Sequence, residues 1–161
     1  MGYTSEFHGE IDIDPPLNGA EIAFLTAFAE ERHEDDPAAP GIWCQWVPGP
    51  FSSGASLAWD RGEKFYNAAE WMAYLIDHFL KPGASAQGAA DELDRFGRVV
   101  GQRPDPLDEF EAFGFNHVLN GVIEVQGEDS DDRWVLTVKD NEVFTQDVNL
   151  NVMSGTPQRV V

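Results

Sequence analysis

The stretch from Gly62 to Pro82 most constrains the fold, because it predicts a buried helix with both of its ends defined. Asn67 is a suitable N-cap, and Glu70 follows three residues later, as a capping box requires. Apolar residues then recur at the helical period and form one stripe, made up of Trp71, Leu75, Ile76 and Phe79. Pro82 ends the pattern, so we expect a helix over about 67–81.

A second helix is predicted near the N-terminus by the same kind of pattern. Asn18 precedes Glu21 by three residues, which again fits a capping box. The following apolar residues, Ile22, Leu25 and Phe28, share one helical face. The chain therefore has two amphipathic helices, each of which needs a surface to cover.

Alternating apolar and polar residues predict that surface to be a β-sheet. The expected strands cover residues 3–14, 41–47, 55–60, 117–125, 133–139 and 143–146. The order β-α-β-β-α-β-β predicts an α+β protein with a ferredoxin-like split β-α-β sandwich. Both helices would cover one face of a mostly antiparallel sheet, with an extra C-terminal hairpin.

The length of 161 residues favours one domain, which we expect to span residues 1–150. Within it, residues 83–116 are rich in small residues, glycine and proline, and they predict a flexible insertion. A short helix over 91–100 and a helical turn over 107–113 are expected inside the insertion. Residues 151–161 are expected to be a frayed tail.

The strongest global feature is the charge, with 29 acidic and 10 basic residues and a net charge of −19. Such a chain repels nucleic acids and anionic membranes and favours a basic protein partner. Solubility alone is the competing explanation. No apolar run approaches the ~20 residues of a membrane span, and the N-terminus lacks a signal-peptide pattern. We therefore expect a cytoplasmic protein that binds neither nucleic acid nor membrane, with an unknown oligomeric state.

Motifs of catalysis and of cofactor binding are missing from the sequence. Phosphate-binding glycine loops and the nucleophile elbow are absent, and the four histidines are scattered without metal-ligand spacing. The single cysteine, Cys44, excludes an internal disulfide and is expected to be a buried thiol. We expect no metal, no cofactor and no catalytic residue, and a protein that is more readily explained as a non-enzyme.

If both helices cover one sheet face, the other face is open, and its residues follow from the alternation. Trp43 is the most informative of them, because a large aromatic residue on an open face indicates an interface. The predicted binding residues on this face are His8, Glu10, Trp43, Gln45, Glu124, Gln126 and Arg133. An ordinary solvated face is the alternative. The aromatic residues of 41–47, Trp59 and Phe65–Tyr66 are also expected to gather near the second helix, as core or as a pocket.

Three stretches of the sequence resemble a known group of proteins. They are Gly-Ile-Trp-Cys-Gln-Trp-Val-Pro (41–48), Gly-Glu-Lys-Phe-Tyr-Asn (62–67) and the segment from His117 to Trp134. The group consists of small, uncharacterised bacterial proteins, common in actinobacteria and also carried by phages. The resemblance implies a shared fold and a bacterial setting, and it brings no activity.

These observations lead to one main functional hypothesis and two alternatives. The main hypothesis is a non-enzymatic acidic protein that binds a protein partner, in the manner of an acidic decoy for a basic surface. The first alternative is a small-ligand-binding or nucleotide-binding protein, or an enzyme, that uses Glu10, Gln45, Glu124 and Arg133. The second is a subunit that self-associates through a strand edge.

Overall fold

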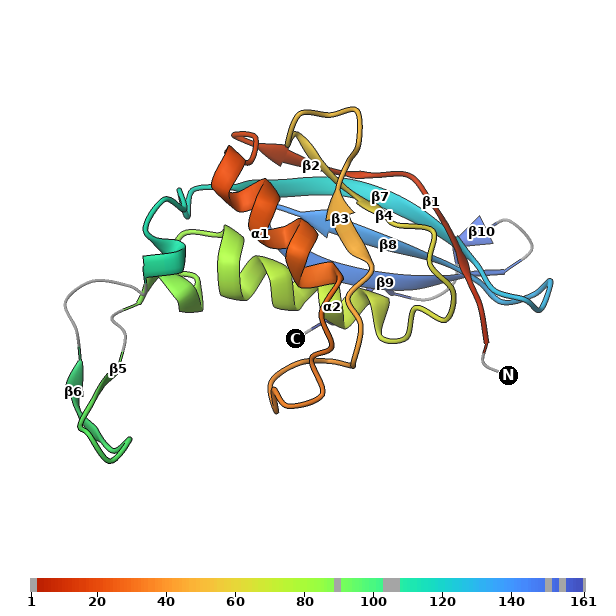
Figure 1. Cartoon of the computed structure of the whole chain (residues 1–161). Helices are drawn as coiled ribbons and strands as arrows, with labels where there is room; N and C mark the ends of the chain where they lie inside the picture. Colours follow the sequence, from red (N-terminus) through yellow and green to blue (C-terminus); the bar gives the residue numbers. More distant parts are fainter. Residues whose placement is uncertain (1–2, 89–90, 103–107, 150–151, 154–155, 161) are drawn as a thin grey trace.

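The computed structural model describes residues 3–88, 91–102, 108–149, 152–153 and 156–160 of the chain. It is an α+β protein in which two helices lie against one face of a mostly antiparallel sheet (Figure 1). The first half contains β1 (Glu6–His8), β2 (Ile11–Asp14), α1 (Gly19–Ala29), β3 (Trp46–Pro48), β4 (Ser56–Trp59) and α2 (Ala68–Leu75). The second half contains β5 (Asp91–Leu93), β6 (Val99–Gln102), β7 (Val118–Gln126), β8 (Arg133–Lys139), β9 (Glu142–Asn149), β10 (Val152–Met153) and β11 (Gln158–Val160).

The main sheet has the strand order β10-β9-β8-β7-β2-β4-β3, with β1 also paired to β7 and β11 to β9. Every strand pair in the described residues is antiparallel. The finer prediction, a ferredoxin-like split arrangement, is not confirmed by this pairing. The coarser prediction, two helices on one side of a mostly antiparallel sheet, is confirmed.

The two predicted capping boxes have different outcomes. In α1 the box is complete, with the Asn18 side chain accepting from the Glu21 amide and the Glu21 side chain accepting from the Asn18 amide. In α2 the box is absent, because Asn67 adopts a left-handed conformation and its side chain makes no capping bond. Its Nδ2 instead donates to the carbonyl of Pro40 at 2.6 Å. The prediction of a capping box at Asn67 was wrong, although a helix does begin at the next residue.

The core lies between the helices and the sheet face that they cover. From the sheet, Ile11, Leu119, Ile123 and Leu136 are fully buried. From the helical segment, which continues from α2 into a π-helical stretch over Ile76–Leu80, the fully buried side chains are Trp71, Met72, Leu75, Ile76 and Leu80. Each such side chain contributes about 1.5–3 kcal/mol by leaving water.

Four predicted elements differ in the structure. The strand expected over 3–14 is divided into β1 and β2 at Gly9 and Glu10, where Gly9 has a positive φ of 120°. The strand expected over 41–47 is confined to Trp46–Pro48, and the helix expected over 91–100 is instead the β5–β6 hairpin. The hairpin forms because the Asp94 carboxylate accepts from the amides of Phe96 and Arg98, and Gly97 takes a positive φ of 77°. In the expected tail, Gln158–Val160 pairs with β9, which gives these residues a strand's hydrogen bonds. Residues 89–90, 103–107, 150–151, 154–155 and 161 lie outside the described residues.

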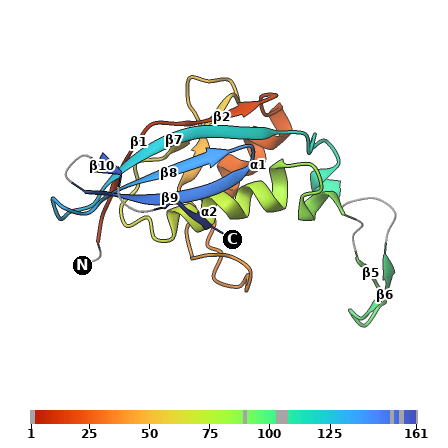
Figure 2. The ribbon, with the colours of Figure 1, turned by 180° about the vertical axis from the view of Figure 1, so that it is seen from behind.

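The opposite face of the sheet is not covered by either helix. Figure 2 shows β7, β8 and β9 from this side, with α1 and α2 behind them. No helix among the described residues combines the length and the apolar character needed to cross a membrane.

A buried ion pair joins the start of α1 to the start of β7. The side chains of Glu21 and His117 are 1% and 2% exposed, and His117 Nε2 lies 2.6 Å from Glu21 Oε2. His117 Nδ1 donates to the carbonyl of Pro15 at 2.6 Å, so this nitrogen carries a proton. Burial opposes the charge on both groups, but the hydrogen bond between them and the hydrogen bonds that each makes to the backbone prevail. They leave the pKa of Glu21 lowered and the pKa of His117 raised.

Substitution of His117 by alanine should destabilise the protein by about 3 kcal/mol, because it leaves the Glu21 carboxylate buried without a counter-charge. His8→Ala is the matched control, since His8 is exposed and should change the free energy of unfolding by less than about 0.5 kcal/mol. Urea unfolding measures both. Equal effects of the two substitutions would contradict a structural role for the pair.

The contribution of the pair to stability should depend on pH from both sides. The raised pKa of His117 stabilises the folded state fully below the ordinary histidine pKa of about 6.5, and this contribution is lost as the pH rises through the folded value. The lowered pKa of Glu21 stabilises above the ordinary glutamate pKa of about 4.3, and this contribution is lost as the pH falls through the folded value. The difference in unfolding free energy between the wild type and the Glu21→Gln/His117→Gln double variant should therefore be largest between about pH 4.3 and 6.5. A difference that does not vary with pH would contradict this assignment.

Candidate functional site

The predicted binding residues fall into two groups. The first group lies together on the open face, where the strand register places His8 opposite Glu124 and Gln126 opposite Arg133. His8 Nε2 also lies 3.6 Å from Glu6 Oε2 at the surface. This part of the face is a mixture of exposed charges of both signs across neighbouring strands, which is typical of a solvated sheet surface.

The second group is not brought to that surface. Gln45 is only 8% exposed, and its amide accepts from Trp59 Nε1 and donates to the carbonyl of Glu63. Trp43 lies before β3 and not on the sheet, while Glu10 lies between β1 and β2 beside Gly49. Gln45 is not available to an enzyme site built from Glu10, Gln45, Glu124 and Arg133, because its side-chain nitrogen and oxygen both make hydrogen bonds within the fold. Gln126 also has a structural use, since its amide donates to three carbonyls of the loop over 127–132.

Concave surface is found elsewhere, around the beginning of α2, where three neighbouring cavities share Asn67 as a lining residue. Their volumes are about 340, 390 and 450 Å³, which is the small end of the range for ligand pockets. We call the region formed by these three cavities the α2 rim.

The largest cavity of the rim, the Trp43 cavity, has mainly apolar walls. It lies between residues 41–43 and the segment that leads into α2, and it is lined by Gly41, Ile42, Trp43, Glu63, Lys64, Tyr66 and Asn67. Ile42, Trp43 and Tyr66 are 44%, 45% and 52% exposed. The prediction that aromatic residues of 41–47 and 65–66 gather near the second helix is thus confirmed, and the exposed ones line a cavity.

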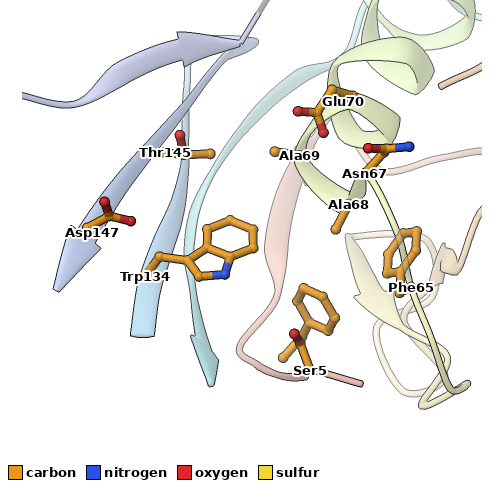
Figure 3. Close-up of a pocket in the computed structure, with 10 residues that line it drawn as sticks. Ser5, Phe65, Asn67, Ala68, Ala69, Glu70, Trp134, Thr145 and Asp147 are labelled. Carbon is orange, nitrogen blue, oxygen red and sulfur yellow. The ribbon is translucent and has the colours of Figure 1, made fainter. Parts of the chain in front are cut away.

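The second cavity, the acidic cavity, lies between the first turn of α2 and the strands. Figure 3 shows Asn67, Ala68, Ala69 and Glu70 on the helix side and Trp134, Thr145 and Asp147 on the strand side. Ser5, Phe7 and Phe65 complete the lining. Its charged lining residues are therefore two carboxylates, while its apolar walls are aromatic.

The third cavity is lined by Ala38, Pro40, Asn67, Glu70, Ala73, Tyr74, Asp77 and His78. The Tyr74 hydroxyl donates to Asp36 Oδ2 at 2.6 Å; burial first, and then this bond, raises the pKa of Tyr74. The same hydrogen bond lowers the pKa of Asp36. His78 stacks on Tyr74 and donates from Nδ1 to the Tyr74 carbonyl. These contacts explain His78 as a packing residue.

The chain is strained where it enters the rim. Arg61, Lys64 and Asn67 all have positive φ values, of 68°, 59° and 60°. Left-handed backbone is uncommon for residues other than glycine, and such strain concentrates at functional sites. Three occurrences at intervals of three residues indicate that the surrounding structure imposes the path of this segment, which contributes residues to all three cavities.

Reactive groups are scarce in the rest of the described chain. Cys44 is fully buried, and burial raises the pKa of its thiol to about 12. This thiol is therefore not an activated nucleophile. Within the described ranges, no group of three or more His, Cys, Asp or Glu side chains is arranged to hold a metal ion.

Comparison with known proteins gives no match to a family model, to a curated protein or to a solved structure. The functional argument therefore depends on the geometry of the α2 rim.

Sequence reasoning selected Trp43 correctly as an exposed aromatic residue, but it missed Asn67 and Glu70 as lining residues of a site. Their spacing predicts that the two residues cap the helix together, and side chains used in a capping box are not expected to bind a ligand. The acidic cavity could not be predicted, because its lining comes from segments as distant as Ser5, Glu70 and Asp147.

Substitution of Lys64 by glycine should stabilise the protein by about 0.5–1 kcal/mol, because glycine adopts the left-handed conformation without the steric cost of a Cβ atom. Lys64→Ala is the matched control, since it removes the charge but keeps the Cβ atom, and it should not stabilise. Thermal and urea unfolding measure both. Equal stabilities of the two variants would show that the backbone at Lys64 is not strained.

Proposed function

We propose that this protein is a non-enzymatic binding protein that holds a basic segment of a partner protein at the α2 rim. The observation that carries the proposal is the Trp43 cavity, which combines exposed apolar side chains with a strained segment and neighbouring carboxylates. Clusters of exposed aromatic residues beside a cavity are the usual anchors of protein interfaces.

The charge of the chain supports a basic partner. A net charge of −19 attracts positively charged proteins at long range and accelerates their association. Such attraction weakens with ionic strength, whereas apolar contacts at Trp43 persist. The charge thus increases the rate at which a basic partner is encountered, and the rim makes the specific contacts with it. A partner surface of this kind is one that nucleic acids also bind, so the protein would compete with nucleic acid as an acidic decoy.

The rim is favoured over the open sheet face for two reasons. Among the residues predicted for that face, Trp43 lies at the rim, and the charged ones lie among opposite charges at an exposed surface. The rim also provides concave apolar surface, which excludes water from a contact and strengthens it.

The proposal is tested by capture of proteins from a bacterial lysate on tagged protein at low and at high salt. We expect basic proteins to be captured at low salt, and Trp43→Ser should reduce their capture roughly tenfold, the loss typical of an aromatic anchor. Phe51→Ser is the matched control, because Phe51 is 100% exposed but lines none of the three rim cavities. Equal capture by the wild type and by Trp43→Ser would rule out the rim as the binding surface.

A further inference from the structure

We propose that the acidic cavity binds the guanidinium group of one arginine side chain. This inference deepens the proposed function and rests on it, since it names the side chain by which a basic partner would be held. It is carried by the position of the cavity, its charge and its aromatic walls.

The cavity exists because the sheet extends beyond the first turn of α2. On the helix-facing side of β8, Val138 and Leu136 are 2% and 0% exposed, while Trp134 is only partly buried. On β9, Thr145 and Asp147 lie beside Leu136 and Trp134 in the register. The uncovered end of this face is therefore an aromatic ring flanked by polar side chains (Figure 3).

The charges of the lining select a cation. Glu70 and Asp147 are its charged members, and no lysine, arginine or histidine lines the cavity. The carboxylate of Glu70 is exposed and makes no hydrogen bond or ion pair with another described residue, and the capping box that would use it is not formed. A ligand with a positive group would provide the missing partner through a charge-assisted hydrogen bond.

The aromatic walls select a planar cation with an apolar stem. Phe7, Phe65 and Trp134 line the cavity, and the Phe7 and Trp134 rings meet edge to face with centroids 6.4 Å apart. A guanidinium group stacks on aromatic rings and also binds carboxylates in a two-pronged geometry, which an ammonium does not. The volume of about 340 Å³ corresponds to roughly ten water molecules. This space fits one long side chain.

The main physical objection is the helix terminus, because the partial positive charge at the first turn of a helix favours a negative group. An anion in this cavity would, however, also meet two carboxylates. At the same distance, a full negative charge repels an anion more strongly than the partial charge of a helix terminus attracts it. Repulsion by Glu70 and Asp147 therefore outweighs the attraction of the helix terminus, and a cation is preferred.

The test is a titration of the whole protein with N-acetyl-arginine amide, followed by the NMR signal of the Trp134 indole, which Trp134→Phe assigns. N-acetyl-citrulline amide is the matched control, because it has nearly the same shape without the charge. We expect millimolar binding of the arginine derivative, at least tenfold tighter than that of the citrulline derivative. Glu70→Gln should weaken binding at least fivefold, whereas Phe51→Ser, at an exposed side chain outside the three cavities, should leave it unchanged.

Several results would overturn the inference. They are equal binding of the two derivatives, no shift of the Trp134 signal, or a larger shift with inorganic phosphate than with the arginine derivative. Its failure is distinguishable from failure of the proposed function. If Trp43→Ser abolishes protein capture but arginine does not bind, only the cavity assignment falls. If arginine binds but Trp43→Ser leaves capture unchanged, the assignment of the rim as the partner surface falls.

Discussion

Burial of α2 against the sheet is the constraint on which the rest of this structure depends. The helix and the π-helical stretch after it are covered on most sides, with Trp71, Met72 and Leu75 completely removed from water. Because these side chains are buried, the position of the helix is set by packing and not by the conformation that its terminal residues prefer. Its first turn is fixed in space, and the chain from Arg61 to Asn67 must reach that point by the path that remains.

The fixed position of α2 explains why two similar sequences at the beginnings of the two helices form different caps. Asn18 and Asn67 both precede a glutamate by three residues, yet only Asn18 forms the capping box. The difference is a distant contact, since Asn67 donates to the carbonyl of Pro40, which approaches from the loop after α1. A local pattern predicts local capping, and it contains no information about a competing acceptor 27 residues away.

The parts of the fold that periodicity controls could be predicted. Both helices and the strands over 55–60, 117–125 and 133–139 follow from their apolar spacing, because burial on one face imposes that spacing. The order of the strands in the sheet could not be predicted, since alternation shows which residues share a face but not which strands are neighbours. The β5–β6 hairpin was missed because its turn, built by Asp94 and Gly97, competes successfully with helix formation in a segment of weak preference.

The candidate site was predictable only as residue types. Trp43 drew attention as a large aromatic residue with no obvious place in the core, and it lines a cavity. The charged residues expected beside it are instead distributed over the solvated sheet face, because the chain before β3 leaves the sheet. The acidic residues are numerous, and two of them, Glu70 and Asp147, border the concave surface to which we assign binding of a cation.

The segment between Leu80 and His117 leaves the core and returns to it at nearly the same point, and this determines where the chain tolerates changes in length. The amide of His117 donates to the carbonyl of Leu80, so the two ends of the intervening segment meet at one hydrogen bond. Ala84 and Phe113 are buried next to these ends, which anchors the segment at both sides. Doubling the length of a closed loop costs only about 0.6 kcal/mol. Phe110 also packs on Phe24 and Phe79, so the tolerant part is the stretch around the β5–β6 hairpin. Insertions and deletions there should be nearly neutral while the sheet and the rim stay the same.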